Sequence, residues 1–387
     1  MNRLILVLAL LVSTLAARAQ GHACRIAVIA PLYLDSAYDA SGNYKLGKSA
    51  PFATFPGLEF AEGARLALDT LQAKGDTIQY TLYDARNLPR LLTEHQLDSV
   101  QLIIGSASGS DYQALAAFAK VRNIPFVSAT FPNEGGISAN PFTVILNPTI
   151  HTHCQAIYHF VLQNHPTHRI LYVRKTGAME DMLEGYFKQL NATTGRDSAL
   201  LPIQTILTGD TVATAQLQQY MDSNRYTVIL CGSLDESFGV SLVRACAGLA
   251  DSYPMTLIGM PTWEGLRALQ SPELRQMPYL VTTSFMPPQT DSNLAPLSMP
   301  QKFITLAHTH PGDMAFRGYE SVYYFVNLLL KYHEGLMSHL DDKGFQTYTP
   351  LDIKPVFVNS ASQIPDYFEN KFLYVLKLQN GFVTRLQ

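Results

Sequence analysis

The fold is decided by three apolar segments: RIAVIAPL (Arg25–Leu32), VQLIIGS (Val100–Ser106) and IPFVSAT (Ile124–Thr130). Amphipathic segments separate them, and each apolar segment ends near small hydroxyl residues. Nearly continuous apolar runs of this length are typical of parallel strands that helices cover on both faces. The same alternation begins again at Arg169. We therefore predict an α/β chain with two copies of an open, mostly parallel sheet flanked by helices, organised as two lobes.

The first 19 residues have the pattern of a signal peptide. A short basic start precedes the apolar segment Leu4–Leu15, and Ala17–Ala19 is an A-x-A cleavage site. Neither this segment nor any later one is long and apolar enough to span a bilayer. We therefore expect a soluble mature chain that is periplasmic or otherwise exported and does not span the membrane. Lipid attachment at Cys24 is an alternative, although Gly21–Ala23 is a poor context for it.

The bulk composition excludes some partners. About 368 residues remain after the leader, which is comfortable for two domains. The leader takes Arg3 and Arg18 with it, which leaves 26 basic against 31 acidic residues and a net charge of −5. This balance gives no electrostatic reason to expect nucleic acid or an anionic membrane surface as a partner. The expected strand and helix place Cys231 and Cys246 ~15 Å apart, too far for a disulfide, so mostly buried free thiols are expected.

Residue periodicity predicts the elements of both lobes. Gly57–Ala73, for example, places Phe60 and Leu68 on one helical face and charged residues on the other. The other predicted helices are Ser110–Arg122, Thr149–Asn164, Glu180–Leu190, Asp235–Leu249 and Met314–Leu336. The other predicted strands are Ile78–Tyr83, Phe142–Leu146, Ile170–Arg174, Thr227–Cys231, Met255–Gly259, Tyr279–Ser284 and a hairpin of Phe372–Leu378 and Phe382–Leu386 around Asn380-Gly381.

Two segments are predicted crossovers between the lobes. Asn147–Thr149 follows the last strand of the first lobe, and Met286–Pro300 holds four prolines. The helix that begins at Met314 is placed back on the first lobe. The predicted division is therefore residues 25–147 plus 287–345 for the first lobe and residues 148–286 plus 346–387 for the second.

Catalytic motifs are missing from the chain. No G-x-G-x-x-G follows the first strand, and there is no Walker loop, H-E-x-x-H or C-x-x-C. Gly105–Gly109 has the spacing of a nucleophile elbow, but its central residue is Ala107. His151, His153 and Cys154 cluster without a carboxylate between them, and we read them as ordinary helix-start residues rather than metal ligands. We expect neither an enzyme nor a bound metal or cofactor.

The strand ends of the first lobe carry candidate ligand contacts, because open α/β sheets bind ligands at the carboxyl ends of their strands. Tyr33 follows the first strand. Ser106 and Ser108 precede a helix, whose first N–H groups suit an anionic or polar ligand group. Ser128 and Thr130 end the next strand. Structural roles are the alternatives: turn hydrogen bonds for the latter two, and a capping box of Ser110 with Gln113 at the helix start.

In the second lobe the candidates are Ser233, Asp235, Trp263 and Glu264. Ser233 and Glu236 again have the spacing of a capping box, which favours a structural role for this serine. Trp263, the only tryptophan, stands in a strand–helix loop and is expected either to stack on a ligand or to plug the hinge side. Glu264 is a candidate partner for an ammonium group.

These residues resemble the type I periplasmic binding proteins, the class that includes leucine/isoleucine/valine receptors. The resemblance runs from about Arg25 to the C-terminus. A closer resemblance is to the receptor-like module of Bacteroidetes exported proteins. The segments that carry it are LEFAEGARLALDTLQAKG (Leu58–Gly75), LIIGSASGSDYQALAAFAKVRNIPFVSAT (Leu102–Thr130), the Asn147–Thr149 crossover, TVILCGSLDESF (Thr227–Phe238) and LIGMPTWEG (Leu257–Gly265).

The resemblance implies a two-lobe clamp joined by three strands that closes on a small polar ligand. In amino-acid receptors of this type, the loop matching Ser106–Ser110 and the strand end matching Ser128–Thr130 hold the ligand carboxylate, and the ammonium partner falls near Glu264. This chain departs from that pattern at Asp111, whose charge would compete with a carboxylate, and no aromatic cluster surrounds Ser233.

The expected function is capture of a small polar, amino-acid-like ligand by hinge closure, with an ABC-type permease as one expected partner. The alternative is an interaction module that regulates cell-wall synthesis through protein–protein contacts, because the same fold resembles the receptor-like part of regulators of cell-wall synthases.

Overall fold

The computed structural model describes residues 24–47, 51–194, 200–286, 298–359 and 361–387. The predicted signal peptide and most of the Met286–Pro300 crossover lie outside these residues. The chain divides into unit 1, Met1–Asn147 with Pro288–Asn370, and unit 2, Pro148–Pro287 with Lys371–Gln387. The chain therefore passes between the units three times.

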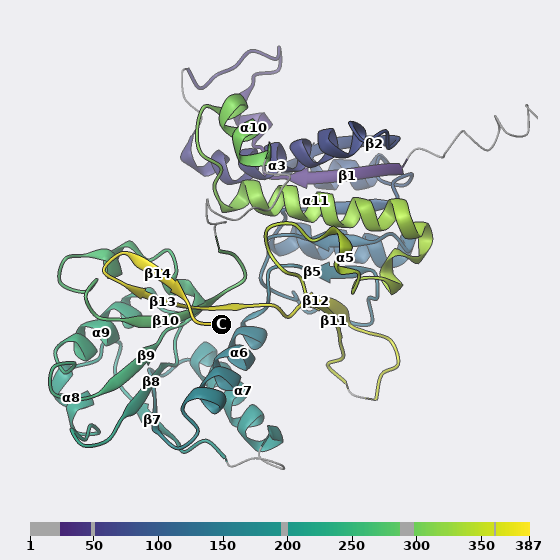
Figure 1. Ribbon diagram of the computed structural model, residues 1–387. Coiled ribbons are helices and arrows are strands. Elements are labelled where there is room, and N and C mark those ends of the chain that lie inside the picture. The colour runs from purple at the N-terminus through teal and green to yellow at the C-terminus, as the bar shows by residue number, and fades with distance from the viewer. Residues whose placement is uncertain (1–23, 48–50, 195–199, 287–297, 360) are drawn as a thin grey trace, which may run out of the picture. The chain divides into compact units, whose positions relative to one another are not determined.

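Unit 1 is built on a seven-stranded sheet (Figure 1). Its strand order is β11-β12-β5-β4-β3-β1-β2, and all neighbours are parallel except β11, which is antiparallel to β12. The strands are β1 (Cys24–Ala30), β2 (Ile78–Asp84), β3 (Leu102–Gly105), β4 (Phe126–Ser128), β5 (Thr143–Ile145), β11 (Ile353–Val356) and β12 (Tyr367–Asn370).

Helices cover both faces of this sheet. On one face Ala27 and Ile29 of β1 pack in one apolar cluster with Leu115 and Ala116, and α3 packs over the other together with α11 (Figure 1). These two helices can approach closely because Gly63 of α3 has no side chain. An ideal Cβ on Gly63 would lie only 1.9 Å from the Ala315 carbonyl oxygen. The helices are α2 (Leu34–Ala37), α3 (Phe55–Gln72), α4 (Leu88–Thr93), α5 (Gly109–Arg122), α10 (Ser298–Ala307) and α11 (Asp313–Tyr332), with 3-10 turns η1 (Phe52–Thr54), η2 (Ala85–Asn87), η5 (His333–Ser338) and η6 (Lys343–Phe345).

Unit 2 repeats this architecture with the strand order β14-β13-β10-β9-β8-β6-β7. Strands β6 to β10 are parallel, β13 is antiparallel to β10, and β14 is antiparallel to β13. The strands are β6 (Arg169–Arg174), β7 (Ile203–Leu207), β8 (Thr227–Cys231), β9 (Met255–Ile258), β10 (Tyr279–Thr283), β13 (Tyr374–Gln379) and β14 (Phe382–Arg385).

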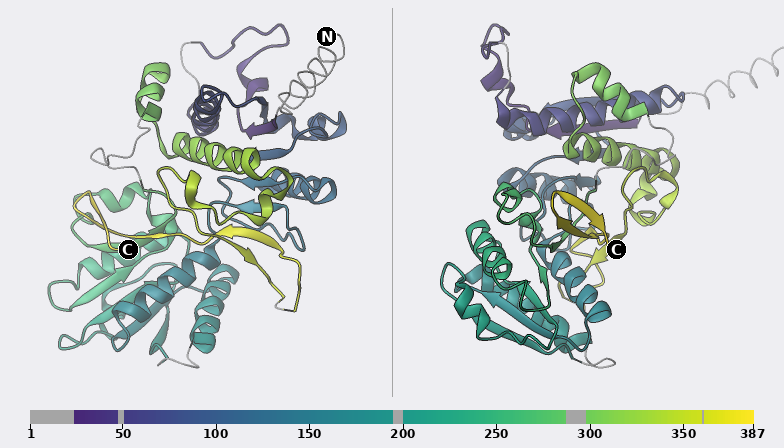
Figure 2. Two further views of the ribbon diagram at one scale, coloured as in Figure 1. Left: turned by 45° about the vertical axis from the view of Figure 1, so that its right-hand side comes forward. Right: turned by 60° about the vertical axis from the view of Figure 1, so that its left-hand side comes forward.

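The side chains of β6 alternate between two cores. Leu171 and Val173 pack in the cluster that contains α9, whereas Ile170 and Tyr172 pack in the cluster that contains α6 and α7. Figure 2 shows these helices on opposite sides of the unit 2 sheet. The helices are α6 (Ile150–Asn164), α7 (Ala178–Thr194), α8 (Thr214–Gln218) and α9 (Glu236–Ala247), with 3-10 turns η3 (Pro261–Trp263) and η4 (Arg267–Gln270).

Two predictions about the C-terminal region have different outcomes. The hairpin around Asn380-Gly381 is confirmed: β13 and β14 flank these residues, whose φ values are 55° and 78°. The assignment of residues 346–387 to the second lobe is wrong for residues 346–370. Here β12 pairs in parallel with β5, so this segment completes the unit 1 sheet.

The cysteines are free and buried, as expected. Among the described residues, no helix has both the length and the apolar character that crossing a membrane requires.

Candidate functional site

The carboxyl ends of β3 and β4 bring two predicted hydroxyl groups together. Gly105 of β3 pairs with Ser128 of β4, so the residues after them leave the sheet side by side. Ser106 Oγ and Thr130 Oγ1 then lie 3.0 Å apart. The Asn147 amide donates to the Thr130 carbonyl oxygen at 2.8 Å, which holds this loop in place.

Ser128 lies deeper than predicted. Its side chain is fully buried in the sheet, and among the described residues its hydroxyl has no hydrogen-bond partner. This position does not support the expected ligand contact: β4 is central in the sheet, so its last side chain is enclosed by the neighbouring layers.

Ser108 is the N-cap residue of α5, and it is exposed. Its own side chain makes no capping hydrogen bond, and the capping box of Ser110 with Gln113 is wrong because the Gln113 amide donates to the Gly135 carbonyl oxygen at 2.9 Å. The first turn of α5 therefore presents N–H groups and the Ser108 hydroxyl together. Asp111 stands in the same turn, and partial burial raises the pKa of its carboxyl.

Tyr33 occupies a strained turn after β1, with a left-handed φ of 56°. Asp84 at the end of β2 shapes this turn, because its two carboxylate oxygens accept the N–H groups of Leu32 and Leu34 at 3.1 and 2.7 Å. The Arg86 guanidinium lies over the Tyr33 ring, 5.5 Å from its centroid, and pairs with Asp35 at 3.1 Å. Sequence reasoning missed Asp84 and Arg86, although an Asp at a strand end was a usable signal.

At the carboxyl edge of unit 2, Asp235 is tied to a lysine. Its Oδ2 lies 2.7 Å from Lys175 Nζ, and its Oδ1 accepts the Phe238 N–H at 2.9 Å as the N-cap of α9. The hydrogen bond from Lys175, followed by that from Phe238, lowers the pKa of Asp235, and the same hydrogen bond raises the pKa of Lys175. Asp210, after β7, lies 3.8 Å from the same ammonium.

Ser233 is enclosed rather than exposed to a ligand. It is fully buried, its hydroxyl donates to Glu180 Oε1 at 2.6 Å, and it accepts the Asp235 N–H at 3.1 Å. The predicted capping box with Glu236 is wrong, because Asp235 and not Ser233 caps α9. The burial of Ser233 and its bond to Glu180 do not support the predicted ligand role.

Arg174, the last residue of β6, was not singled out from the sequence. Its side chain is 6% exposed and pairs with Asp181 and, at 2.6 Å, with Glu184. With Lys175, and with Lys188 paired to Glu184 at 2.9 Å, three cations lie among the carboxylates of Glu180, Asp181, Glu184, Asp210 and Asp235.

Trp263 is part of the unit 2 core. The indole is 0% exposed, and its ring centroid lies 5.6 Å from that of Tyr279. Gly239 and Gly259 make room for it, since an ideal Cβ on them would lie 2.5 and 2.2 Å from ring atoms. The expectation of a ring open to a ligand is thus corrected. The next residue, Glu264, is exposed.

The described residues contain no group of three or more metal-ligating side chains. His153 Nδ1 contacts the Thr282 hydroxyl at 2.8 Å, and the His151 ring packs edge-on against Tyr186.

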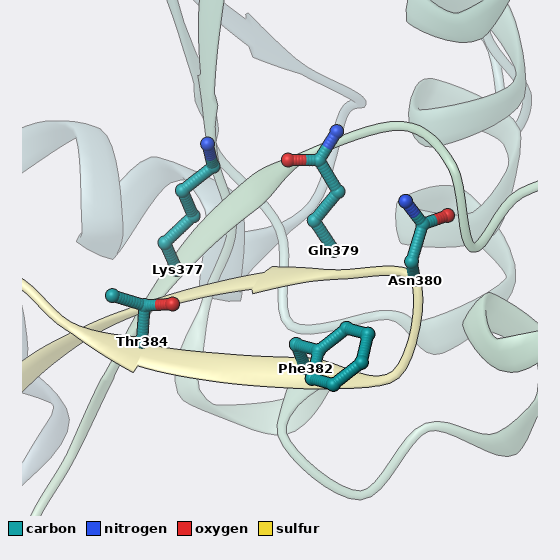
Figure 3. Close-up of a pocket in the computed structure, with 5 residues that line it drawn as sticks. All are labelled: Lys377, Gln379, Asn380, Phe382 and Thr384. Atoms are coloured by element: carbon teal, nitrogen blue, oxygen red, sulfur yellow. The ribbon is translucent and has the colours of Figure 1, made fainter.

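A shallow depression of about 180 Å³ lies on the C-terminal hairpin. Figure 3 shows its lining, the side chains Lys377, Gln379, Asn380, Phe382 and Thr384. It contains none of the predicted ligand residues.

The chain matches the family model of the periplasmic binding proteins over residues 46–344. No curated protein matches it. A putative branched-chain amino acid ABC transporter from Rhodospirillum rubrum is similar in structure, with a TM-score of 0.67, 14% identity, and 94% of this chain and 100% of that chain covered. A leucine-binding protein from Thermotoga maritima has a TM-score of 0.56 and 15% identity, with 94% and 98% covered. A Desulfitobacterium hafniense substrate-binding protein in complex with Leu has a TM-score of 0.58 and 15% identity, with 94% and 100% covered. These low identities show a shared fold, and the family match shows more: the chain belongs to the periplasmic binding protein family.

Proposed function

We propose that this protein is an exported solute-binding protein that captures a small polar ligand by closing its two units on it. The observation that carries the proposal is the hydroxyl pair of Ser106 and Thr130 at the carboxyl edge of unit 1, beside the N-terminus of α5. Carboxyl edges are where open α/β sheets bind ligands. Closure would follow from a ligand that contacts both units only when they are closed, which shifts the population toward that state.

The carboxyl edges of the two units carry groups that are complementary to an amino-acid-like ligand. Hydroxyls and helix N–H groups in unit 1 suit a carboxylate. In unit 2, five carboxylates surround the three cations Arg174, Lys175 and Lys188, and this excess of negative charge suits an ammonium group. Of the sequence candidates, we retain Tyr33, Ser106, Ser108, Thr130, Asp235 and Glu264. We leave out Ser128, Ser233 and Trp263, which are 0% exposed, whereas Ser106 is 7% exposed.

We further propose export through the signal peptide and delivery of the ligand to an ABC-type permease. One of the similar structures is described as a putative branched-chain amino acid ABC transporter, and another as an ABC transporter substrate-binding protein. These descriptions support an ABC-type permease as the partner class.

A thermal-shift panel of amino acids, short peptides, sugars and aromatic acids tests the proposal. A ligand at 100 times its Kd stabilises the folded state by about 2.7 kcal/mol, which a melting experiment resolves. A second measurement, small-angle X-ray scattering, should show a smaller radius of gyration with the same ligand. Stabilisation by none of these compounds, together with capture of a cell-wall synthase, would instead favour the regulatory alternative.

A further inference from the structure

Two histidines meet at the amino edge of the unit 2 sheet, opposite the strand ends discussed above. His165 follows α6, and His168 directly precedes β6. The His168 N–H donates to the His165 carbonyl oxygen at 3.2 Å, closing a turn that contains Pro166. This turn brings the two imidazoles together, with their Nδ1 atoms 3.1 Å apart.

Aromatic packing orients both rings. The Tyr226 ring stacks on His165 with an interplanar angle of 7° and lies 5.1 Å from His168, centroid to centroid. The Tyr226 hydroxyl is in turn held by Thr256 at 2.8 Å. Both histidines are half-buried. The rings are therefore preorganised by their neighbours rather than by each other alone.

The charge around the pair permits a cation. Arg169 is adjacent in sequence, but its guanidinium donates to the Tyr220 carbonyl oxygen at 2.6 Å and to Gln204 at 2.7 Å. The neutral imidazole is the form that ligates metals.

We propose that His165 and His168 form a two-imidazole chelate for a divalent late transition metal. With metal–nitrogen bonds of about 2.05 Å, the 3.1 Å separation of the Nδ1 atoms subtends ~98° at the metal. This angle lies between the square-planar and the tetrahedral values. No third His, Cys, Asp or Glu joins the pair among the described residues, so water completes the coordination. Cu²⁺ should bind more tightly than Ni²⁺ or Zn²⁺, as nitrogen sites generally prefer it.

A proton shared between the two Nδ1 atoms fits the same distance and is the competing arrangement. The shared proton and the metal chelate predict different effects of the substitution His168→Asn. An asparagine amide preserves a hydrogen-bond donor for His165 but removes one of two metal ligands. Exposed His308, in unit 1, provides the matched control variant His308→Asn.

The test is a Cu²⁺ titration of tag-free protein by calorimetry, with nitrogen ligation followed by electron paramagnetic resonance. Every sample carries His22→Asn, since a histidine close to a free amino terminus binds Cu²⁺ by itself. We expect one site in the parent protein and in His308→Asn, and an affinity at least about tenfold lower in His168→Asn. Equal affinities in all three, or no nitrogen ligation, would overturn the proposal. His165→Gln gives the same comparison if His168→Asn does not fold, as judged by circular dichroism.

Discussion

The hydroxyls of Ser106 and Thr130 lie 3.0 Å apart across the carboxyl ends of β3 and β4. The two residues are 24 positions apart in the chain. Parallel pairing of Gly105 with Ser128 makes them neighbours, because it sends both strand exits to the same edge of the sheet. The pair therefore follows from sheet register and not from local sequence.

Replacing Ser106 by alanine should weaken ligand binding, and the loss of its hydrogen bond with Thr130 should also lower the unfolding free energy by about 1 kcal/mol. One lost hydrogen bond corresponds to about 1 kcal/mol, or roughly a fivefold loss of affinity. Calorimetric titration with the ligand found in the thermal-shift panel measures the affinity. Ser138→Ala, at an exposed position of unit 1 outside this loop, is the control. If both variants bind the ligand equally well, the hydroxyl pair does not contact it.

Replacing Gly239 by alanine should destabilise unit 2. An ideal Cβ there lies 2.5 Å from Trp263 Nε1, and the indole is fully buried, so the ring must shift at a cost of about 1–3 kcal/mol. Urea unfolding followed by far-UV circular dichroism measures this cost.

Gly185→Ala is the matched control, because Gly185 is also inside a helix but has no atom within 4 Å of an ideal Cβ. That variant should be stabilised by up to about 1 kcal/mol through helix propensity. Equal effects of the two substitutions would contradict the tight packing of Trp263 against α9.

Asp235 should stabilise the folded state through both its cap on α9 and its ion pair with Lys175. Asp235→Asn keeps an acceptor for the Phe238 N–H and loses the pairing with Lys175, whereas Asp235→Ala loses both. The alanine variant should therefore unfold more easily than the asparagine variant by about 1 kcal/mol.

The contribution of the ion pair should depend on pH with a defined sign. The pKa of Asp235 is lowered in the folded state, so the stabilisation is present above the unfolded pKa near 3.9 and is lost as pH falls through the folded pKa. In urea unfolding, the difference between the parent and Asp235→Asn should shrink from pH 7 to pH 3. A difference that stays constant would rule out the ion pair as its source.

Glu320 of α11 should have the opposite pH dependence. Burial raises its pKa to about 7, although Thr349 donates to it through its backbone N–H and, at 3.2 Å, through its hydroxyl. The folded state then binds more protons than the unfolded state between about pH 4.5 and 7. Unfolding free energy should therefore fall as pH rises through this window, by at most about 3 kcal/mol.

Glu320→Gln should remove this dependence and be more stable than the parent at pH 8, because a neutral amide carries no desolvated charge. Urea unfolding at pH 5 and pH 8 measures both proteins, with exposed Glu334→Gln as control. A parent and a Glu320→Gln variant that respond identically to pH would show that this carboxyl ionises normally.

Much of the fold could be predicted from local patterns. The strand Thr227–Cys231 has the predicted bounds, and α5 begins one residue before its predicted start. The last hairpin was readable because Asn380 and Gly381 adopt the positive φ values that a tight turn requires. In each case the signal and the structure are both local.

The candidate site was predicted less well, because burial is not local. Ser233 and Ser106 both follow strands, yet Ser233 is enclosed by Glu180, 53 residues away, whereas Ser106 meets Thr130. Trp263 ends the short 3-10 turn η3, outside the regular helices and strands, but glycines on α9 and after β9 open a space for its ring in the core.

By itself, the sequence determined the α/β alternation, the doubled architecture and the turn chemistry, because these depend on apolar periodicity and on the φ preferences of single residues. Only the tertiary structure decided that β11 and β12 complete the first sheet, since strand segments as short as Ile353–Val356 and Tyr367–Asn370 form through pairing: β12 pairs with β5, and β11 pairs with β12. It also decided which strand-end side chains are enclosed by ion pairs and packing, because that depends on residues that only folding brings within a few ångströms of each other.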